Sequence, residues 1–264
     1  QSGEWYGEVG TQRNKELKDA AFLRNELKLN PTNKTAVIFP HMFWDATFFW
    51  GEDLFGNYEQ WFVETVRNAV KNDRLNWIIK IHPANKMKDQ RDGYSGEHSE
   101  ILSIRKHFGE LPDHIKVLPA DNIISTISLY EVADYCLTVR GTVGIECACF
   151  GVTVLTAGTG RYDGKGFTED SNTAEEYLEK VRNLDRIQSV TEEEIELARR
   201  FAYGVFLCRP IPLNSVKLEY QQDEKASLQT DLLFQNDEEL RQGEDVQSLK
   251  KWIESGNEDY LISS

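Results

Sequence analysis

Short apolar segments alternate with longer amphipathic segments between residues 36 and 156. The apolar segments are rich in β-branched side chains and are bounded by turn residues, which is typical of buried strands. Between them, apolar residues recur at helical spacing. This alternation predicts an α/β fold with a parallel, doubly wound sheet flanked by helices. The expected strands are 36–39, 77–81, 115–118, 135–139 and 152–156, and the expected helices between them are 57–71, 99–107, 123–132 and 143–150.

Helical spacing continues outside this region. We expect helices over residues 11–29, 172–182, 191–206 and 237–254, the third opening on a capping box of Thr191 and Glu194. The pattern divides the chain into three parts. These are residues 1–34, a helical segment or the remnant of a preceding lobe, residues 35–210, the α/β domain, and residues 211–264, an acidic helical extension.

The chain is organised around residues 134–168, which are predicted to form a strand, a glycine turn, a short helix, a second strand and a glycine-rich loop. A helix that opens after a buried strand directs unpaired backbone N–H groups at the ligand crevice and favours phosphate. Gly141 allows close approach, Thr142 offers a hydroxyl and Arg140 a cation. Glu146 lies one turn beyond Thr142 and could accept sugar hydroxyls. Alternatively, Glu146 is solvated and Arg140 pairs with an acid.

Two further strand ends carry candidate chemistry. The aromatic loop of residues 41–50 holds His41 and Asp45 and is either part of a site or a hydrophobic plug between two lobes. His82 follows the strand at 77–81, and Pro83 stops that strand. There the imidazole could donate to a phosphate or a leaving oxygen, or serve as a satisfied structural histidine.

Two loops are less specific. The glycine loop of residues 158–167 does not fit G-x-G-x-x-G and opens no helix, so a dinucleotide fingerprint is rejected and a flexible lid is expected. Lys86, Lys88 and Arg91 could guide an anionic substrate or form a solvated loop.

Composition narrows the class of protein. The net charge of −14, half of it carried by residues 217–264 with 12 Asp and Glu against 5 Lys and Arg, argues against nucleic acid or an anionic membrane as the main partner. Three of the four cysteines sit in apolar runs without zinc-ligand spacing, which fits a reduced cytosolic compartment. The sequence has no run of 18 apolar residues. The first residue is Gln1 and not Met, so the chain was either processed or is a piece of a longer protein, and we expect the second.

Several motifs now coincide in order and spacing. They are FPHMFWDATFFWGEDLF, IKIHPAN, DYCLTVRGTVGIECACFG, LTAGTGRYDGKGF and ARRFAYGVFLCRP. Together, over about residues 35–210, they resemble the bacterial capsule polysaccharide biosynthesis family, GT-B glycosyltransferases related to Kdo transferases.

The resemblance implies a Rossmann-like lobe that binds a nucleotide-activated sugar. The sugar would be CMP- or UDP-linked, with CMP-Kdo among the candidates, and the acceptor lobe would lie elsewhere. His82 would contact the donor phosphate, Arg140, Gly141 and Thr142 would form the phosphate-facing turn, and Glu146 would hold the ribose. The base is expected in the other lobe, with His41 and Asp45 the local candidates. Lys80, Gly158, Thr159 and Gly160 complete the implied donor site.

The sequence has no D-x-D motif, so no metal cofactor is expected, and the helix dipole with His and Arg must stabilise the leaving nucleotide. The implied acceptor is a polysaccharide or glycolipid, and the implied location is the cytoplasm at the inner face of the bacterial inner membrane, within a capsule assembly complex. Alternatives on the same fold are a sugar-nucleotide epimerase, a CDP-glycerol-type glycerophosphotransferase or a non-catalytic interaction module.

Overall fold

The computed structural model describes residues 15–44, 53–85, 93, 96–211, 213–221 and 227–261. The chain forms two compact units. The larger comprises residues 14–199, and the smaller combines residues 1–13 with 200–264. The candidate chemistry of the sequence falls in the larger unit.

The larger unit is built on a five-stranded sheet in the order β3-β2-β1-β4-β5. All four strand pairings are parallel. The predicted doubly wound, Rossmann-like α/β fold is therefore confirmed, and each expected strand lies within one residue of its predicted bounds. The strands are β1 (Thr35–Ile38), β2 (Asn76–Lys80), β3 (Ile115–Leu118), β4 (Tyr135–Thr138) and β5 (Thr153–Thr156).

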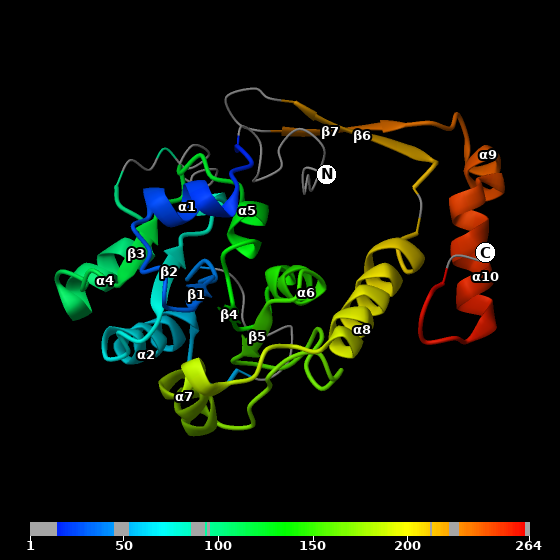
Figure 1. Ribbon diagram of the computed structural model, residues 1–264. Coiled ribbons are helices and arrows are strands. Elements are labelled where there is room, and N and C mark those ends of the chain that lie inside the picture. Colours follow the sequence, from blue (N-terminus) through cyan, green and yellow to red (C-terminus); the bar gives the residue numbers. More distant parts are fainter. Residues whose placement is uncertain are drawn as a thin grey trace. The chain divides into compact units, whose positions relative to one another are not determined.

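Helices cover both faces of this sheet. Figure 1 shows α4, α2 and α7 on one face and α1, α5 and α6 on the other. The first set is α4 (Ser99–Phe108), α2 (Tyr58–Val70) and α7 (Ala174–Arg182), and the second is α1 (Ala20–Glu26), α5 (Thr126–Tyr130) and α6 (Thr142–Cys149). A short 3₁₀ turn (Leu184–Arg186) and α8 (Glu192–Tyr203) follow.

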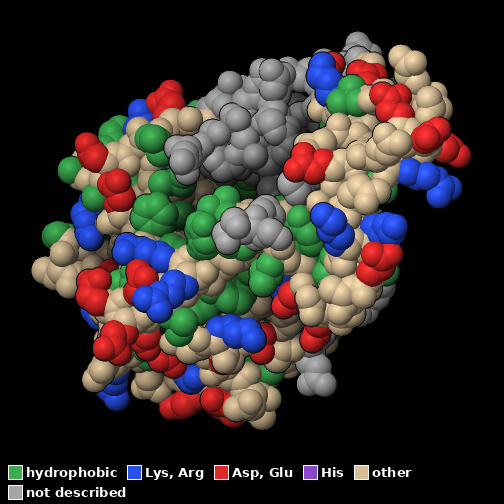
Figure 2. All heavy atoms as spheres, turned by 90° about the vertical axis from the view of Figure 1, so that its right-hand side faces the viewer, with side chains coloured by type: hydrophobic (Ala, Val, Ile, Leu, Met, Phe, Trp, Pro, Cys, Tyr) green, Lys and Arg blue, Asp and Glu red, His purple; other side chains and the backbone are tan. Residues whose placement is uncertain are grey.

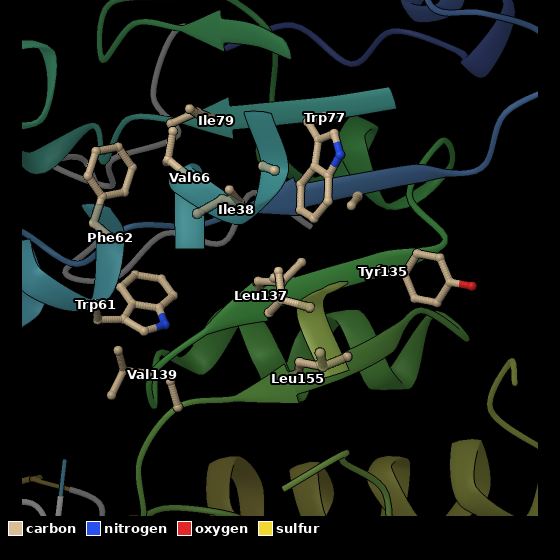
Figure 3. Packing of buried hydrophobic residues seen from close by; sticks show 14 of the residues in the cluster. Ile38, Trp61, Phe62, Val66, Trp77, Ile79, Tyr135, Leu137, Val139 and Leu155 are labelled. Carbon is tan, nitrogen blue, oxygen red and sulfur yellow. The ribbon is translucent and has the colours of Figure 1, made fainter. Parts of the chain in front are cut away.

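The main core lies between the sheet and the layer of α2, α4 and α7. Alternate strand residues point to this side, so Ile38, Ile79, Leu137 and Leu155 meet the large rings of α2 (Figure 3). Trp61 and Phe62 of α2 are almost wholly buried there. Burial of aromatic rings of this size is the main force that holds the helix layer to the sheet.

Local sequence signals fix where several helices begin. The Asn57 side chain accepts from the amide of Gln60 at the start of α2, and the Thr173 hydroxyl accepts from that of Glu176 at the start of α7. At α8 the predicted capping box is present, since the Glu194 amide donates to Thr191 Oγ1 at 3.3 Å and the Thr191 amide to Glu194 Oε2 at 2.6 Å.

Two predicted helices are shorter than expected. Residues 11–14 of the helix expected over 11–29 lie outside the described residues, and the described remainder is helical only in α1, because Glu16 pairs with Ile124 in a β-bridge. That bridge also shortens the helix expected over 123–132, which begins only at Thr126. Long-range backbone pairing thus overrides local helical spacing at both places.

The smaller unit contains a hairpin that the sequence reading missed, β6 (Val216–Gln221) paired antiparallel with β7 (Ser227–Leu232). The helix expected over 237–254 is split into α9 (Asp237–Gln242) and α10 (Glu244–Ser255). The break falls at Gly243, where an added Cβ would lie 2.8 Å from Ser215 Oγ. A five-residue π-helix, Gly204–Cys208, continues α8.

Within the described part of the chain, no helix is long and apolar enough to cross a membrane. On the face seen in Figure 2, described Lys and Arg side chains are interspersed with Asp and Glu. That face therefore carries charges of both signs. This agrees with a chain in which half of the net negative charge lies in residues 217–264.

Candidate functional site

The strand order places the candidate site at the junction of β1 and β4. The chain leaves β1 toward one side of this junction and reaches β4 from the other, so the loops at the two carboxyl ends diverge and leave a crevice. His41 follows β1, and Arg140 and Gly141 follow β4. Residues about 100 positions apart in sequence are thereby brought to one edge.

His41 binds directly to the turn that ends β4. Its Nε2 lies 3.3 Å from the backbone N of Arg140 and 3.4 Å from Thr138 Oγ1. Its ring stacks on Tyr58, with centroids 4.4 Å apart and planes inclined by 15°. Because a backbone amide only donates, Nε2 is the acceptor and the ring proton resides on Nδ1.

Burial lowers the pKa of His41 to about 3, and electrostatic interactions with His82, Arg140 and Arg161 act in the same direction. His41 is therefore neutral over the physiological range. The same interactions place the His82 imidazole and two guanidinium groups within electrostatic range of His41.

His82 lies at this edge as well, immediately beyond β2. Its Nδ1 accepts from the amide of Ala84 at 3.1 Å. In the neutral ring the proton is then on Nε2, which makes His82 a hydrogen-bond donor at that atom. The predicted proximity of His82 to the turn at Arg140 agrees with their common effect on His41.

Arg140 is buried, with 3% of its surface exposed, and forms an ion pair with Asp53. Burial raises the pKa of Asp53, while the guanidinium of Arg140 acts in the opposite direction. Of the two possibilities left open by the sequence, pairing with an acid is the one observed. The pair fixes the end of β4.

Helix α6 begins at Thr142, one residue before its predicted start, and its N-terminal end lies beside His41. Its N-cap is Gly141, and no side chain in the described ranges caps it. The carbonyl of Gly141 instead accepts the Tyr162 hydroxyl at 2.8 Å. Gly144 is in contact with the same phenol, since a Cβ there would lie 2.1 Å from Tyr162 Oη. Tyr162 therefore holds the first turn of α6 in place.

Glu146 lies one turn further along α6. Tyr130 donates to its Oε2 at 2.8 Å, and Thr142 also hydrogen-bonds to it. Surrounding protein raises the pKa of Glu146, and these two hydrogen bonds oppose that rise. The residue still presents surface to solvent. Glu146 is thus an oriented carboxylate that can accept a further donor.

The glycine loop differs from the expected flexible lid. Tyr162 and Phe167 are each 1% exposed, and their rings stack with centroids 6.1 Å apart. The amides of Gly160 and Gly164 donate to Asp163 and Asp170. The two buried rings and the two hydrogen bonds from glycine amides to aspartate side chains therefore hold the loop against the rest of the unit. Of the predicted donor residues in it, Gly158 is buried, Thr159 half-buried and Gly160 exposed.

Lys80 is buried at the end of β2, on the side of the loop that follows β3. Its Nζ lies 3.4 Å from the carbonyl oxygens of Ile81 and Pro119. Burial, with a contribution from Lys15, lowers its pKa to about 8. Asp45 and the basic residues Lys86, Lys88 and Arg91 lie outside the described residues.

Four residues at this edge were not singled out by the sequence. Tyr58 and Tyr162 carry no local signature, because their roles depend on contacts with His41 and Gly141. Asp53 follows the aromatic loop, and Arg161 stands directly after Gly158-Thr159-Gly160. A cation adjoining a predicted phosphate-binding segment was the one available sequence signal.

Comparisons with known proteins agree with this architecture. A family model described as "Capsule polysaccharide biosynthesis protein" matches residues 11–194. No curated protein sequence matches the chain.

Three solved structures illustrate the structural likeness. One is KpsC, a beta Kdo 2,4 transferase of Thermosulfurimonas dismutans, with 19% identity, TM-score 0.42, and 70% of this chain and 48% of that chain covered. Sucrose-phosphate synthase of Thermosynechococcus elongatus has 13% identity and a TM-score of 0.46, and the match covers 70% of this chain and 45% of that chain. The S. aureus MnaA–UDP co-structure has 12% identity and a TM-score of 0.42, and the match covers 69% of this chain and 47% of that chain. The chain spans less than half the length of each.

Proposed function

This chain belongs to the capsule polysaccharide biosynthesis family, and from that premise we propose that it is the donor-binding part of a GT-B glycosyltransferase. Its donor is a sugar activated by a cytidine or uridine nucleotide, CMP-Kdo among the candidates. Its acceptor is a growing surface polysaccharide or glycolipid. An acceptor-binding lobe supplies the other wall of the active site.

One observation carries the proposal. The hydrogen bond from the Arg140 amide to Nε2 of His41 joins the loop after β1 to the turn from which α6 starts. The start of α6 and His82 then lie at one edge of the sheet, beside a His41 that remains a neutral acceptor, and in the proposed complex the first-turn amides and the Nε2–H of His82 bind the donor phosphate. Such an arrangement stabilises the negative charge that develops on a departing nucleotide phosphate. Arg140, neutralised by Asp53, orients the turn, and the exposed Arg161 adds a cation.

Glu146 supports the nucleoside end of the donor. Its carboxylate is oriented by Tyr130 and lies one turn from the phosphate-facing end of α6. This spacing suits a nucleoside whose phosphate sits at the helix start and whose ribose hydroxyls donate to the carboxylate.

The geometry separates the roles of the two histidines. Nε2 of His41 is engaged by the Arg140 amide, and its low pKa makes it a weak base, so His41 positions the turn. His82 is the residue of the pair that touches the phosphate. The base that activates the acceptor is then Asp45 or a group of the acceptor lobe.

Calorimetric titration of the chain with CMP, CDP, UDP and their sugars tests the proposal. The His82→Ala variant should bind the preferred nucleotide about 10- to 100-fold more weakly, because a charge-assisted hydrogen bond of about 1.5–3 kcal/mol is lost. His107→Ala, at an exposed position of α4, is the matched control. A folded protein that binds none of these nucleotides would refute donor binding, and product analysis with an added acceptor lobe separates transfer from epimerisation or glycerophosphate transfer.

A further inference from the structure

A groove of about 370 Å³ opens beside the crevice, between the loop after β1 and helices α2 and α4. Its lining comes from three elements: Phe43 and Trp44 of the loop, Glu59 of α2, and Ser99, Leu102, Ser103 and Lys106 of α4. Its volume falls in the range of about 300–1,000 Å³ that small-molecule sites occupy. Phe43 follows His41 by two residues, and Glu59 adjoins Tyr58, on which His41 stacks. The groove is therefore adjacent to the crevice.

The indole of Trp44 is exposed yet held in place. It is 45% exposed, and its Nε1 donates to Asn85 Oδ1 at 3.1 Å. Asn85 in turn donates to both carboxylate oxygens of Glu100, at 2.9 and 3.1 Å. Asn85 and Glu100 are 5% and 1% exposed. A buried network that orients a solvent-exposed ring reduces the entropy lost when a ligand packs on that ring.

The rest of the lining combines oriented oxygens, an apolar contact and one cation. Ser103 Oγ donates to Glu59 Oε1 at 3.0 Å, which fixes the carboxylate in the groove. Ser99, Leu102 and Lys106 follow the same ridge of α4, and Leu102 is 45% exposed. A lining that contains an apolar ring, fixed acceptors and a cation matches an amphipathic ligand with C–H faces, several hydroxyls and one negative group.

We propose that this groove binds an acidic saccharide, with one pyranose ring packed on the face of Trp44. Its hydroxyl groups donate to Glu59 and bond with the serines of α4, and its carboxylate faces Lys106. A planar aromatic platform suits the C–H face of a sugar ring, because the π face carries negative charge. That this saccharide is the acceptor of the transfer rests on the proposed function; the binding itself does not.

The test uses a glycan array that carries acidic and neutral oligosaccharides, followed by calorimetry with the best-bound glycan and no nucleotide present. We expect acidic oligosaccharides to bind more tightly than neutral ones of equal length. Trp44→Leu should weaken binding at least tenfold, and Lys106→Ala should reduce the preference for acidic over neutral glycans to parity. Lys106 is exposed, so its variant keeps the fold.

Phe22→Ala, which alters a 43%-exposed aromatic residue of α1 outside the groove lining, should leave glycan binding unchanged. The proposal is overturned if no glycan binds, if neutral and acidic glycans bind equally, or if the Trp44 and Lys106 variants bind like the unmodified protein. Nucleotide titration of the same variants distinguishes this outcome from failure of the donor site, since Trp44→Leu should retain nucleotide binding while losing the saccharide.

Discussion

The imidazole Nε2 of His41 accepts the backbone amide of Arg140 at 3.3 Å, and this contact joins the loop after β1 to the turn after β4. The two residues come from the two strands between which the sheet reverses its winding direction. A neutral, buried imidazole at this point sets the geometry of the α6 start without carrying charge itself.

The low pKa of His41 predicts a specific pH dependence of stability. Unfolded His41 takes up a proton near pH 6.5, whereas folded His41 does so only near pH 3, so stability falls as pH falls through this window. The loss is at most about 1.4 kcal/mol per pH unit. Urea unfolding at pH 7 and pH 5 measures it. The His41→Gln variant lacks this titrating group, so its stability should fall less between pH 7 and pH 5. Equal pH dependence in both proteins would contradict the burial assigned to His41.

The contact between Gly144 and Tyr162 predicts an unusual cost for a helical alanine. Gly144→Ala should lower the free energy of unfolding by about 1–3 kcal/mol, because its methyl group would overlap the Tyr162 hydroxyl. Chemical denaturation measures the cost, which should be smaller in a Tyr162→Phe background because the nearest clashing atom is absent. Gly204→Ala, at a helical glycine with no atom within 4 Å of an added Cβ, is the control. An undiminished cost in the double variant would mean that the phenol does not pack there.

Glu146 predicts discrimination between ribose and deoxyribose. If its carboxylate accepts the 2′-hydroxyl of the donor nucleoside, CMP should bind about tenfold more tightly than dCMP, equivalent to about 1.4 kcal/mol. Glu146→Gln should reduce that ratio, and Tyr130→Phe should reduce it less, since the phenol orients the carboxylate without touching the ligand. Competition titrations with the two nucleotides provide the ratio. A ratio near one in the unmodified protein would remove Glu146 from the nucleoside site.

Buried Lys80 predicts a stability gain on substitution. Its pKa of about 8 lies below the ordinary value, so the folded state releases its proton before the unfolded state, and stability rises between about pH 8 and pH 10.5. At pH 7 the buried charge is destabilising, and Lys80→Met should raise the free energy of unfolding by about 1–3 kcal/mol. Denaturation at pH 7 and pH 9.5 checks both statements. A variant that is less stable at pH 7 would show that Lys80 makes compensating contacts.

The sheet could be predicted because its strands are short apolar runs separated by helical spacing. The carboxyl ends that carry His41, His82 and Arg140 could therefore be placed at one edge before their contacts were known. The pairing of Arg140 with Asp53 was left as an alternative, since a cation at a strand end serves a ligand or an acid equally well in sequence.

Other features depend on contacts between distant segments. The glycine loop resembled a lid because its glycines suggest mobility, yet Tyr162 and Phe167 anchor it in a way that local composition does not reveal. The Glu16–Ile124 bridge shortens two helices whose own spacing is favourable. The hairpin of β6 and β7 was missed although the residues of β6, VKLEYQ, alternate strictly between apolar and polar, which is the sequence signal of a strand.

The most direct test of the central claim is an ¹H–¹⁵N NMR titration of the ¹⁵N-labelled chain with CMP, CDP and UDP. We predict saturable shifts of the Thr142 and Val143 amides and of the imidazole nitrogens of His82, with the His41 ring remaining neutral throughout. Saturable nucleotide binding that leaves the start of α6 and His82 unperturbed would contradict the account.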